Sequence, residues 1–234
     1  MKPNIAIVVP VYNPHAGWHT LLLQRYKELV SENNNYHFFL YLVNDGSTNH
    51  IAENEIQLLK DNVQDFQYFS YNQNQGKGFA LRYAIQNIET EYILYTDIDL
   101  PFTIESMNCI LQEIKTNDIV FGIKQKSYYE QLPLQRKFIS KTLQKFIKIL
   151  FPILPVSDTQ CGLKAMNQKG KHVFLNTSIN RYLFDLEFIL FASKNNLNIK
   201  PIPVSLRPGI VFGNMNFKII LHESKNLWKI LKKK

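Results

Sequence analysis

The sequence predicts an α/β protein with a mainly parallel sheet and helices on both faces of that sheet. Short runs of β-branched and aromatic residues alternate, through the first half of the chain, with segments whose apolar residues recur at helical spacing. This alternation is typical of repeated strand–helix units. Unusual polar clusters follow the strand-like runs directly, at the edge where such sheets bind ligands. The 234 residues, 45% of them hydrophobic, suit one globular domain over residues 1–234.

Each expected element rests on its own pattern. Strands are expected where β-branched and aromatic residues form short runs bounded by turn residues. Helices are expected between them, because apolar residues there return every three or four positions. The expected strands are 5–11, 36–43, 66–71, 92–95 and 118–123, and the expected helices run through 21–30, 51–59, 80–85 and 103–114.

Cysteine content and hydropathy indicate a cytoplasmic protein. Cys109 and Cys161 are too few for a disulfide framework, which suits a reducing compartment. No stretch approaches the roughly 20 apolar residues of a membrane span. Residues 1–10 lack the basic start and the long apolar core of a signal peptide.

The net charge of +8 is concentrated in two segments of the second half. Residues 124–148 carry seven basic side chains and one acidic side chain, and residues 217–234 carry six and one. A basic surface can meet nucleic acid, anionic lipid or a phosphorylated substrate. Because both segments are also amphipathic, we expect a lipid surface as the partner and no nucleic acid.

Residues 134–151 are expected to form a basic amphipathic helix. Leu143, Phe146, Ile147 and Leu150 fall on one side of it, and a row of lysines falls on another. Such a helix is typical of a membrane surface, and a packed helix with a solvated lysine face is the alternative. A C-terminal helix that contains Trp228 repeats this combination. The lysines of the row are Lys137, Lys141, Lys145 and Lys148.

Asp97 and Asp99 end the apolar run 92–95 and form the most informative pair in the chain. Two carboxylates at the end of a buried strand are costly without a counter-charge. On an extended chain they would point the same way, toward a cation with a preference for oxygen ligands, Mg²⁺ or Mn²⁺. The alternative is a loop in which Asp97 caps the helix that begins near Thr103. The other polar strand ends favour the metal site.

Two further motifs follow strand-like runs. N-D-G-S-T, which contains Asp45, is either a tight turn or a site whose carboxylate accepts hydrogen bonds from a nucleobase or ribose. N-Q-G-K-G, which contains Lys77, lets the backbone approach a ligand and places a positive charge at a helix start. Both motifs are compatible with purely structural roles.

The second half contains two dense polar motifs. D-T-Q-C-G-L-K starts at Asp158, and Cys161 within it is expected to be a small buried residue without a histidine partner. R-Y-L-F-D-L-E-F starts a helix whose first turn carries Asp185 and Glu187, where acids also favour the helix dipole.

Together these motifs resemble those of family 2 glycosyltransferases of the GT-A fold. V-V-P-V-Y-N, V-N-D-G-S-T, N-Q-G-K-G-F-A and T-D-I-D-L occur in the order and approximate spacing of that family. D-T-Q-C-G-L-K followed by F-D-L-E is similar to the branch that contains dolichyl-phosphate β-glucosyltransferase and related polyprenyl-phosphate sugar synthases. The resemblance covers nearly the whole chain.

The resemblance implies a nucleotide-diphosphate sugar donor, expected to be uridine-linked, and inversion at the anomeric carbon. It implies that residues 1–123 form the nucleotide-sugar-binding half and residues 124–234 the acceptor and membrane-proximal half. The implied metal ligands are Asp97 and Asp99, for Mg²⁺ or Mn²⁺. The implied nucleotide-sugar-binding residues are Pro10, Tyr12, Asn13, Asp45, Lys77, Asp97 and Arg207.

For the acceptor side, the resemblance implies catalytic roles for Asp158, Asp185 and Glu187. The residues implied near the acceptor phosphate are Arg136, Ser140 and Gln160. A lipid phosphate needs no strong general base because its oxygen is already anionic. A hydroxyl acceptor needs a carboxylate to take its proton, and Asp185 or Asp158 would serve.

The chain also departs from the family pattern. Pro14 stands where many relatives have an acidic residue, Asn44 replaces the first aspartate of D-D-G-S, and F-G-N-M-N-F-K from Phe212 replaces G-x-S-K. Most lipid-linked members also carry a membrane span. Without one, this chain is expected to bind the membrane peripherally, on its inner face, or to use another acceptor.

The expected function is metal-dependent transfer of a hexose from a nucleotide sugar to a polyprenyl phosphate. The first alternative is a transferase that extends a cell-surface glycan at a sugar hydroxyl. A non-catalytic nucleotide-sugar or lipid-binding module is a further alternative, disfavoured by the intact pair Asp97 and Asp99. A nucleotidyltransferase would need a glycine-rich basic loop after the first strand, and V-Y-N-P-H-A-G-W is not such a loop.

Overall fold

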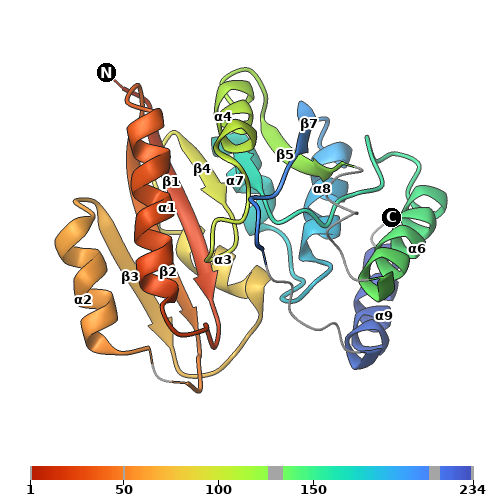
Figure 1. Cartoon of the computed structure of the whole chain (residues 1–234). Coiled ribbons are helices and arrows are strands. Elements are labelled where there is room, and N and C mark those ends of the chain that lie inside the picture. Colours follow the sequence, from red (N-terminus) through yellow and green to blue (C-terminus); the bar gives the residue numbers. More distant parts are fainter. Residues whose placement is uncertain (1, 50, 126–133, 211–216, 233–234) are drawn as a thin grey trace.

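A computed structural model describes residues 2–49, 51–125, 134–210 and 217–232. Its described strands form a seven-stranded sheet in the order β3-β2-β1-β4-β6-β5-β7 (Figure 1). Each of the five strands expected from the sequence is present. The strands are β1 (Asn4–Val11), β2 (His37–Asp45), β3 (Phe66–Tyr71), β4 (Tyr92–Tyr95), β5 (Ile119–Lys124), β6 (Lys164–Met166) and β7 (Ile199–Val204).

The sheet is mainly parallel, as predicted. β1 pairs in parallel with both β2 and β4, so the carboxyl ends of these strands lie at one edge. β6 runs antiparallel between β4 and β5, and β7 pairs in parallel with β5. The sequence did not predict these two strands. β6 has three residues, too few to show a period, and β7 contains Pro201 and Pro203, which a sheet accommodates at an edge.

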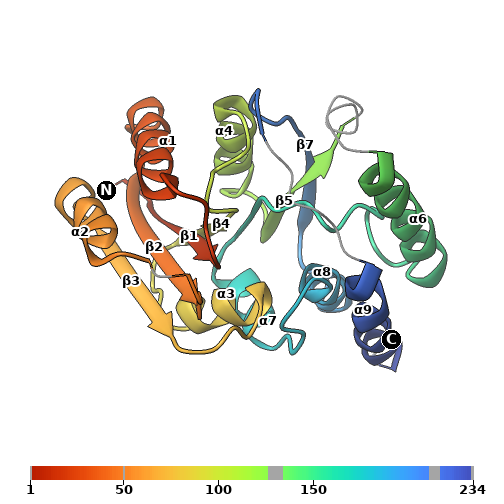
Figure 2. The same cartoon turned by 60° about the horizontal axis from the view of Figure 1, so that its bottom comes forward.

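Helices cover both faces of the sheet (Figures 1 and 2). One face carries α1 (Trp18–Glu32), α2 (Glu53–Asn62) and α4 (Ile104–Glu113). The other carries α3 (Lys77–Ile85), α7 (Gln168–Leu175) and α8 (Phe184–Lys194). Each layer buries its own apolar core against the sheet. The predicted α/β architecture with helices on both faces is confirmed.

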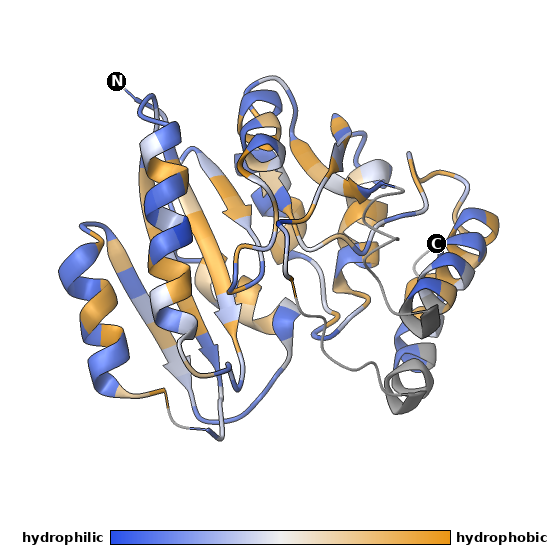
Figure 3. Ribbon diagram, in the orientation of Figure 1, coloured by the Kyte–Doolittle hydropathy of each residue, from blue (hydrophilic) through white to orange (hydrophobic). Residues whose placement is uncertain are grey.

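Two amphipathic helices, α6 (Leu134–Leu150) and α9 (Phe217–Lys232), lie side by side at one end of the molecule (Figures 1 and 2). Ile147 of α6 and Ile230 of α9 are buried in the same core cluster as α3 and α8. Phe146, which the sequence places on the same side of the helix as Ile147, is 55% exposed, so only part of this apolar side is buried. Figure 3 shows apolar residues gathered along β1 and alternating with hydrophilic ones along α6.

β6 and β7 of residues 124–234 pair within the same sheet as the strands of residues 1–123. The expected division into two functional halves therefore does not coincide with two separate sheets, and it stays a prediction. None of the helices in the described ranges is long and apolar enough to cross a membrane.

Candidate active site

Asn13 ties the loop after β1 to the loop after β2. Its φ of 46° lies in the left-handed region, which asparagine tolerates better than most residues. Its Oδ1 accepts hydrogen bonds from the backbone N–H groups of Thr48 (2.8 Å) and Asn49 (3.0 Å). Its own N–H donates to Ser47 Oγ at 3.0 Å. Ser47 and Thr48 thus serve this junction, and the next helix, α2, begins only after Ala52.

Two other predicted nucleotide residues lie beside this junction. Pro10 is part of β1, and Tyr12 follows the strand with 48% of its surface exposed. The aromatic ring of Tyr12 is therefore accessible at the ligand-binding edge of the sheet. Contact of either residue with a nucleotide stays a prediction.

Asp45 ends β2 and is buried. One carboxylate oxygen accepts hydrogen bonds from the Tyr71 hydroxyl (2.8 Å) and the Gln75 N–H (2.7 Å). The other accepts from Asn74 Nδ2 (2.8 Å) and the Gly76 N–H (2.9 Å). Asp45 therefore holds the loop before α3 in place. Its predicted contact with a nucleobase would have to share oxygens that are already hydrogen bonded.

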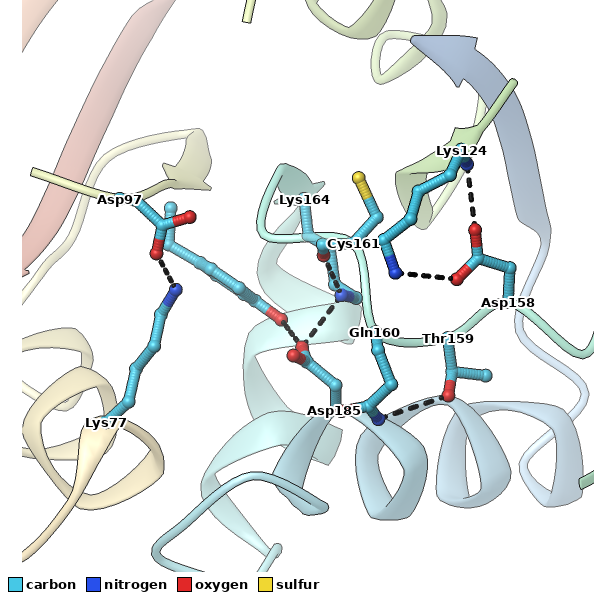
Figure 4. A network of polar contacts seen from close by, with 10 residues as sticks. Lys77, Asp97, Lys124, Asp158, Thr159, Gln160, Cys161, Lys164 and Asp185 are labelled. Carbon is cyan, nitrogen blue, oxygen red and sulfur yellow. Dashed lines mark hydrogen bonds and ion pairs between the residues drawn. The ribbon is translucent and has the colours of Figure 1, made fainter. Parts of the chain in front are cut away.

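Lys77 opens α3 and reaches the end of β4. Its Nζ forms an ion pair with Asp97 Oδ1 at 2.5 Å (Figure 4). Burial lowers the pKa of Lys77, but the carboxylates of Asp97 and Asp185 outweigh this effect and the pKa is raised overall. The ammonium is thus held in its charged form between two carboxylates that the sequence assigned to different roles.

Asp97 and Asp99 lie in a turn, and the predicted extended conformation was wrong. The Leu100 N–H donates to the Asp97 carbonyl at 3.0 Å, and Leu100 has a φ of 38°. The alternative role for Asp97 as a helix cap was wrong too, because Thr103 Oγ1 accepts the capping hydrogen bond from the Ser106 N–H. The two carboxylates remain close enough to interact: burial, and then the charge of Asp97, raise the pKa of Asp99.

This pair fits a divalent cation. A Cβ added to Gly162 would lie 2.5 Å from Asp97 Oδ2, so the D-T-Q-C-G-L-K loop can approach the carboxylate only because residue 162 is glycine. The described ranges contain no cluster of three or more His, Cys, Asp or Glu side chains able to hold a metal. Mg²⁺ is commonly held by one or two carboxylates together with substrate phosphates. Asp97 and Asp99 match that donor set.

Asp158 lies on the far side of the loop from Asp97 (Figure 4). Its Oδ1 pairs with Lys124 Nζ at 3.1 Å, and its Oδ2 accepts from the Lys124 N–H at 2.8 Å. Both oxygens are thus engaged in fastening the loop to the end of β5. Gln160 follows in this loop and donates to Thr159 Oγ1 at 3.4 Å.

A buried ion pair lies beneath the same loop. Lys164 is completely buried, and its Nζ contacts Asp185 Oδ1 at 2.8 Å and the Cys161 carbonyl at 2.6 Å. The Tyr95 hydroxyl donates to the same Asp185 oxygen at 2.7 Å. Asp185 Oδ2 makes no hydrogen bond within the described ranges. This oxygen is consequently the one that Asp185 could offer to a reacting group.

Glu187 does not face the site. It is completely buried, and it accepts hydrogen bonds from the N–H groups of Ser178 (2.8 Å) and Ile179 (2.7 Å). Arg82 binds the same loop through the Thr177 hydroxyl (3.1 Å) and the Ile179 carbonyl (2.9 Å). The predicted catalytic role of Glu187 does not fit this burial, because a substrate cannot reach its carboxylate. Glu187 shapes the loop that packs against the start of α3.

Arg207 is turned toward α1. Its Nη1 pairs with Glu28 Oε2 at 2.9 Å, and its Nε donates to the Phe102 carbonyl at 3.0 Å. Contact of Arg207 with a diphosphate stays a prediction, and it would require these hydrogen bonds and the ion pair to break. Ser140 lies on α6, and Arg136 belongs to the same helix with its side chain outside the described part of the chain.

Cys161 is buried, and burial raises the pKa of its thiol to about 11. It is a protonated, inaccessible thiol at neutral pH, as expected from the sequence.

The sequence reasoning missed Lys164, Tyr95, Arg82 and Arg25. Lys164 and Tyr95 stand within motifs that the sequence had singled out. The sequence predicted no strand at Lys164, however, and so gave no sign that this lysine is buried. Arg25 carries a clearer signal. It lies three residues after Leu22 and four before Leu29, both buried, so helical periodicity alone places it on the packed side of α1.

The model of glycosyl transferase family 2 matches residues 6–170, well over half of the chain. The chain belongs to glycosyl transferase family 2. A dolichyl-phosphate beta-glucosyltransferase of Saccharomyces cerevisiae is 24% identical over 221 residues, which cover 86% of this chain and 66% of that protein. One from Trichomonas vaginalis is 29% identical over 215 residues, which cover 86% of this chain and 64% of that protein. The chain thus spans just under two thirds of the length of these relatives.

The fold is shared with solved glycosyltransferases. Glucosyl-3-phosphoglycerate synthase from Mycobacterium tuberculosis, solved with Mn²⁺, UDP and glucosyl-3-phosphoglycerate, superposes with a TM-score of 0.69 at 14% identity. The superposition covers 98% of this chain and 78% of that protein. The predicted GT-A fold and the predicted resemblance to the family and its branch are confirmed.

Proposed function

We propose that this chain transfers a hexose from a nucleotide-diphosphate sugar to a polyprenyl phosphate, with inversion and with a divalent cation. The observation that carries the proposal is the meeting of Asp97, Asp99 and Lys77 with Gly162 at the carboxyl edge of the sheet. One cationic and two anionic groups, beside a loop that a glycine allows to approach Asp97, suit a metal-bound diphosphate. The sequence relatives named as dolichyl-phosphate glucosyltransferases support the acceptor class.

The protein's own residues bind and orient the donor. Asp97 and Asp99 would hold Mg²⁺ or Mn²⁺, which when bound neutralises charge on the departing nucleoside diphosphate. Lys77 places a second positive charge beside the same group. The acceptor oxygen forms a bond to the anomeric carbon while the bond from that carbon to the diphosphate oxygen breaks. A UDP-linked donor is our preferred choice, since the structurally similar M. tuberculosis synthase was solved with UDP and Mn²⁺.

The ion pairs of the site favour an acceptor that is already anionic. Asp158 has both oxygens bonded to Lys124, and Glu187 is completely buried. Asp185 keeps Oδ2 alone for a proton, while Lys164 and Tyr95 occupy Oδ1. A phosphate monoester needs no such base, whereas a sugar hydroxyl needs one. A glycan acceptor therefore depends on a single oxygen of Asp185.

We further propose that the chain works on the inner face of a membrane, through the outer surface of α6. Phe138 and Ile149 are 72% and 76% exposed, and they stand on one line of the helix with Lys145. A shallow hollow beside this line is lined by Phe138 and three lysines. Apolar side chains interleaved with lysines suit the boundary between anionic headgroups and acyl chains.

The test is incubation of the purified protein with Mn²⁺, a panel of UDP- and GDP-sugars and a short polyprenyl phosphate. Nucleoside diphosphate release that requires the lipid phosphate, with a matching glycolipid product, is the expected result. Turnover with a glycan acceptor and none with lipid would overturn the acceptor class. Binding of the nucleotide sugar without any turnover would favour a non-catalytic module.

A further inference from the structure

The turn from Asp97 to Leu100 contains a strained residue, and we call it the metal turn because it carries the two proposed metal ligands. Leu100 is completely buried and has a φ of 38°, in the left-handed region that a branched side chain rarely adopts. Such a conformation costs about 1–2 kcal/mol for a residue with a Cβ. It persists where the surrounding structure holds it in place. The contacts that hold this turn therefore also determine the positions of Asp97 and Asp99.

One contact comes from α1. Arg25 Nη1 donates to the Asp99 carbonyl, within the turn that the Leu100 N–H closes on the Asp97 carbonyl. The Arg25 guanidinium also lies close enough to the Asp99 carboxylate for their charges to attract. One side chain thus contacts the middle of the turn through both the backbone and the charge of a proposed metal ligand.

A second set of contacts secures the segment after the turn. The Arg207 N–H donates to the Pro101 carbonyl at 2.8 Å, and its Nε donates to the Phe102 carbonyl at 3.0 Å. Glu28, one turn after Arg25 on α1, pairs with Arg207 Nη1 at 2.9 Å. Charges alternate along this row, from Arg25 through Glu28 to Arg207. The row connects α1, the metal turn and the segment after β7.

We propose that Arg25 is a positioning residue for the metal, which holds the strained turn so that Asp97 and Asp99 stay close enough to share one cation. The inference rests on the proposed function, since it assigns Arg25 a task in the same metal site. Arg25 does not bind the metal or the nucleotide in this proposal. It acts through the Asp99 backbone, and Arg207 supports the same stretch of chain.

The test measures Mn²⁺ binding directly, without turnover. Free Mn²⁺ is followed by electron paramagnetic resonance in the presence of UDP or GDP, and thermal unfolding is recorded in parallel. Arg25→Met retains the apolar stem and removes every donor. It is expected to weaken Mn²⁺ binding by about 10- to 100-fold, the usual effect of losing a group that orients a ligand.

Two variants complete the design. Arg25→Lys keeps the charge but not the planar guanidinium, so an intermediate loss is expected. Lys27→Ala is the matched control, because Lys27 lies on the exposed side of α1 and donates to Asn62 Oδ1 at 2.9 Å. Its Mn²⁺ affinity is expected to equal that of the wild type.

The outcomes separate the inference from the proposed function. Wild-type Mn²⁺ affinity in Arg25→Met and Arg25→Lys overturns the inference, and so does an equal loss in Lys27→Ala. A lower unfolding temperature with unchanged Mn²⁺ affinity assigns Arg25 to stability alone, and it also overturns the inference. A wild-type protein that binds no Mn²⁺ with either nucleotide overturns the proposed metal site itself, and the inference with it.

Discussion

At the scale of single residues, we expect the proposed metal ligand Asp99 to lower the stability of the metal-free protein. Burial and the nearby charge of Asp97 raise the pKa of Asp99, so this carboxyl binds a proton more readily in the folded protein than in the unfolded chain. The stabilising effect of that proton is present at acid pH and is lost as pH rises through the raised pKa. At neutral pH the ionised Asp99 carboxylate therefore lowers the free energy of unfolding, and a bound cation would offset this loss.

Asp99→Asn should raise the thermal unfolding temperature of the metal-free protein at pH 7 while abolishing Mn²⁺-dependent activity. The gain should be small, within about 1 kcal/mol, because the group is partly solvated. It should shrink as the pH falls through the raised pKa of Asp99, because the wild-type carboxyl then takes up a proton as well. Melting curves in EDTA, recorded from pH 7 into the acid range, provide the measurement. Full activity in the variant would remove Asp99 from the metal site.

Gly162 allows a second prediction at the residue scale. Gly162→Ala places a Cβ 2.5 Å from Asp97 Oδ2 and must displace that carboxylate. We expect at least a tenfold weaker affinity for Mn²⁺ with UDP, measured by titration calorimetry, and near-normal folding. Gly209→Ala is the control, because its Cβ would meet nothing within 4 Å, although its φ of 77° brings backbone strain. If Gly209→Ala weakens Mn²⁺ binding equally, proximity to Asp97 is not the cause.

At the scale of elements, the sequence predicted the strands and helices that repeat a clear period. β1 to β5 and the helices between them have clear apolar patterns, so their existence followed from the order of residues in the sequence. β6 and β7 could not be predicted in this way, because a three-residue strand shows no period and the two prolines of β7 argue against a strand. The buried position of Lys164 was hidden for the same reason, since it lies in β6.

The proposed binding of α6 to a membrane depends on the exposed lysines and apolar side chains of this helix. Charge reversal at Lys137, Lys141 and Lys145 should abolish binding to vesicles that contain anionic lipid, and replacement of Phe138 and Ile149 by serine should weaken binding to all vesicles. Both follow from a helix that uses lysines for headgroups and apolar side chains for acyl chains. Vesicle co-sedimentation measures the effect.

The matched control for α6 is on α2, where Lys60→Glu and Leu58→Ser change an exposed lysine and a partly exposed leucine far from α6. Vesicle binding should be unchanged in this control. Equal binding by the wild type and all α6 variants would indicate a merely solvated lysine face on α6.

At the scale of the whole molecule, the site is assembled from segments far apart in the sequence. Asp97 follows β4, Lys77 opens α3, Gly162 precedes β6, and Arg25 reaches in from α1. The parallel order of the sheet makes the first two predictable, because strand ends meet at one edge. The approach of Gly162 to Asp97 depends on packing that no local pattern encodes. The period of α1 places Arg25 on the packed side of the helix, but it does not show that Arg25 contacts the Asp99 carbonyl. Glu187 illustrates the opposite error, in which a polar motif residue is a buried support.

Thermal unfolding with and without ligands tests the assembled site as a unit. The described ranges offer two carboxylates for a metal and no larger cluster, so Mn²⁺ alone should bind weakly. A diphosphate supplies the remaining oxygens, and Lys77 supplies its counter-charge. Mn²⁺ with UDP at 100 times the dissociation constant should stabilise the folded protein by about 2.7 kcal/mol, and Mn²⁺ or UDP alone by much less. If Mn²⁺ alone raised the stability by the same amount, the protein itself would have to supply the remaining metal ligands. That result would contradict a metal site formed only by Asp97 and Asp99.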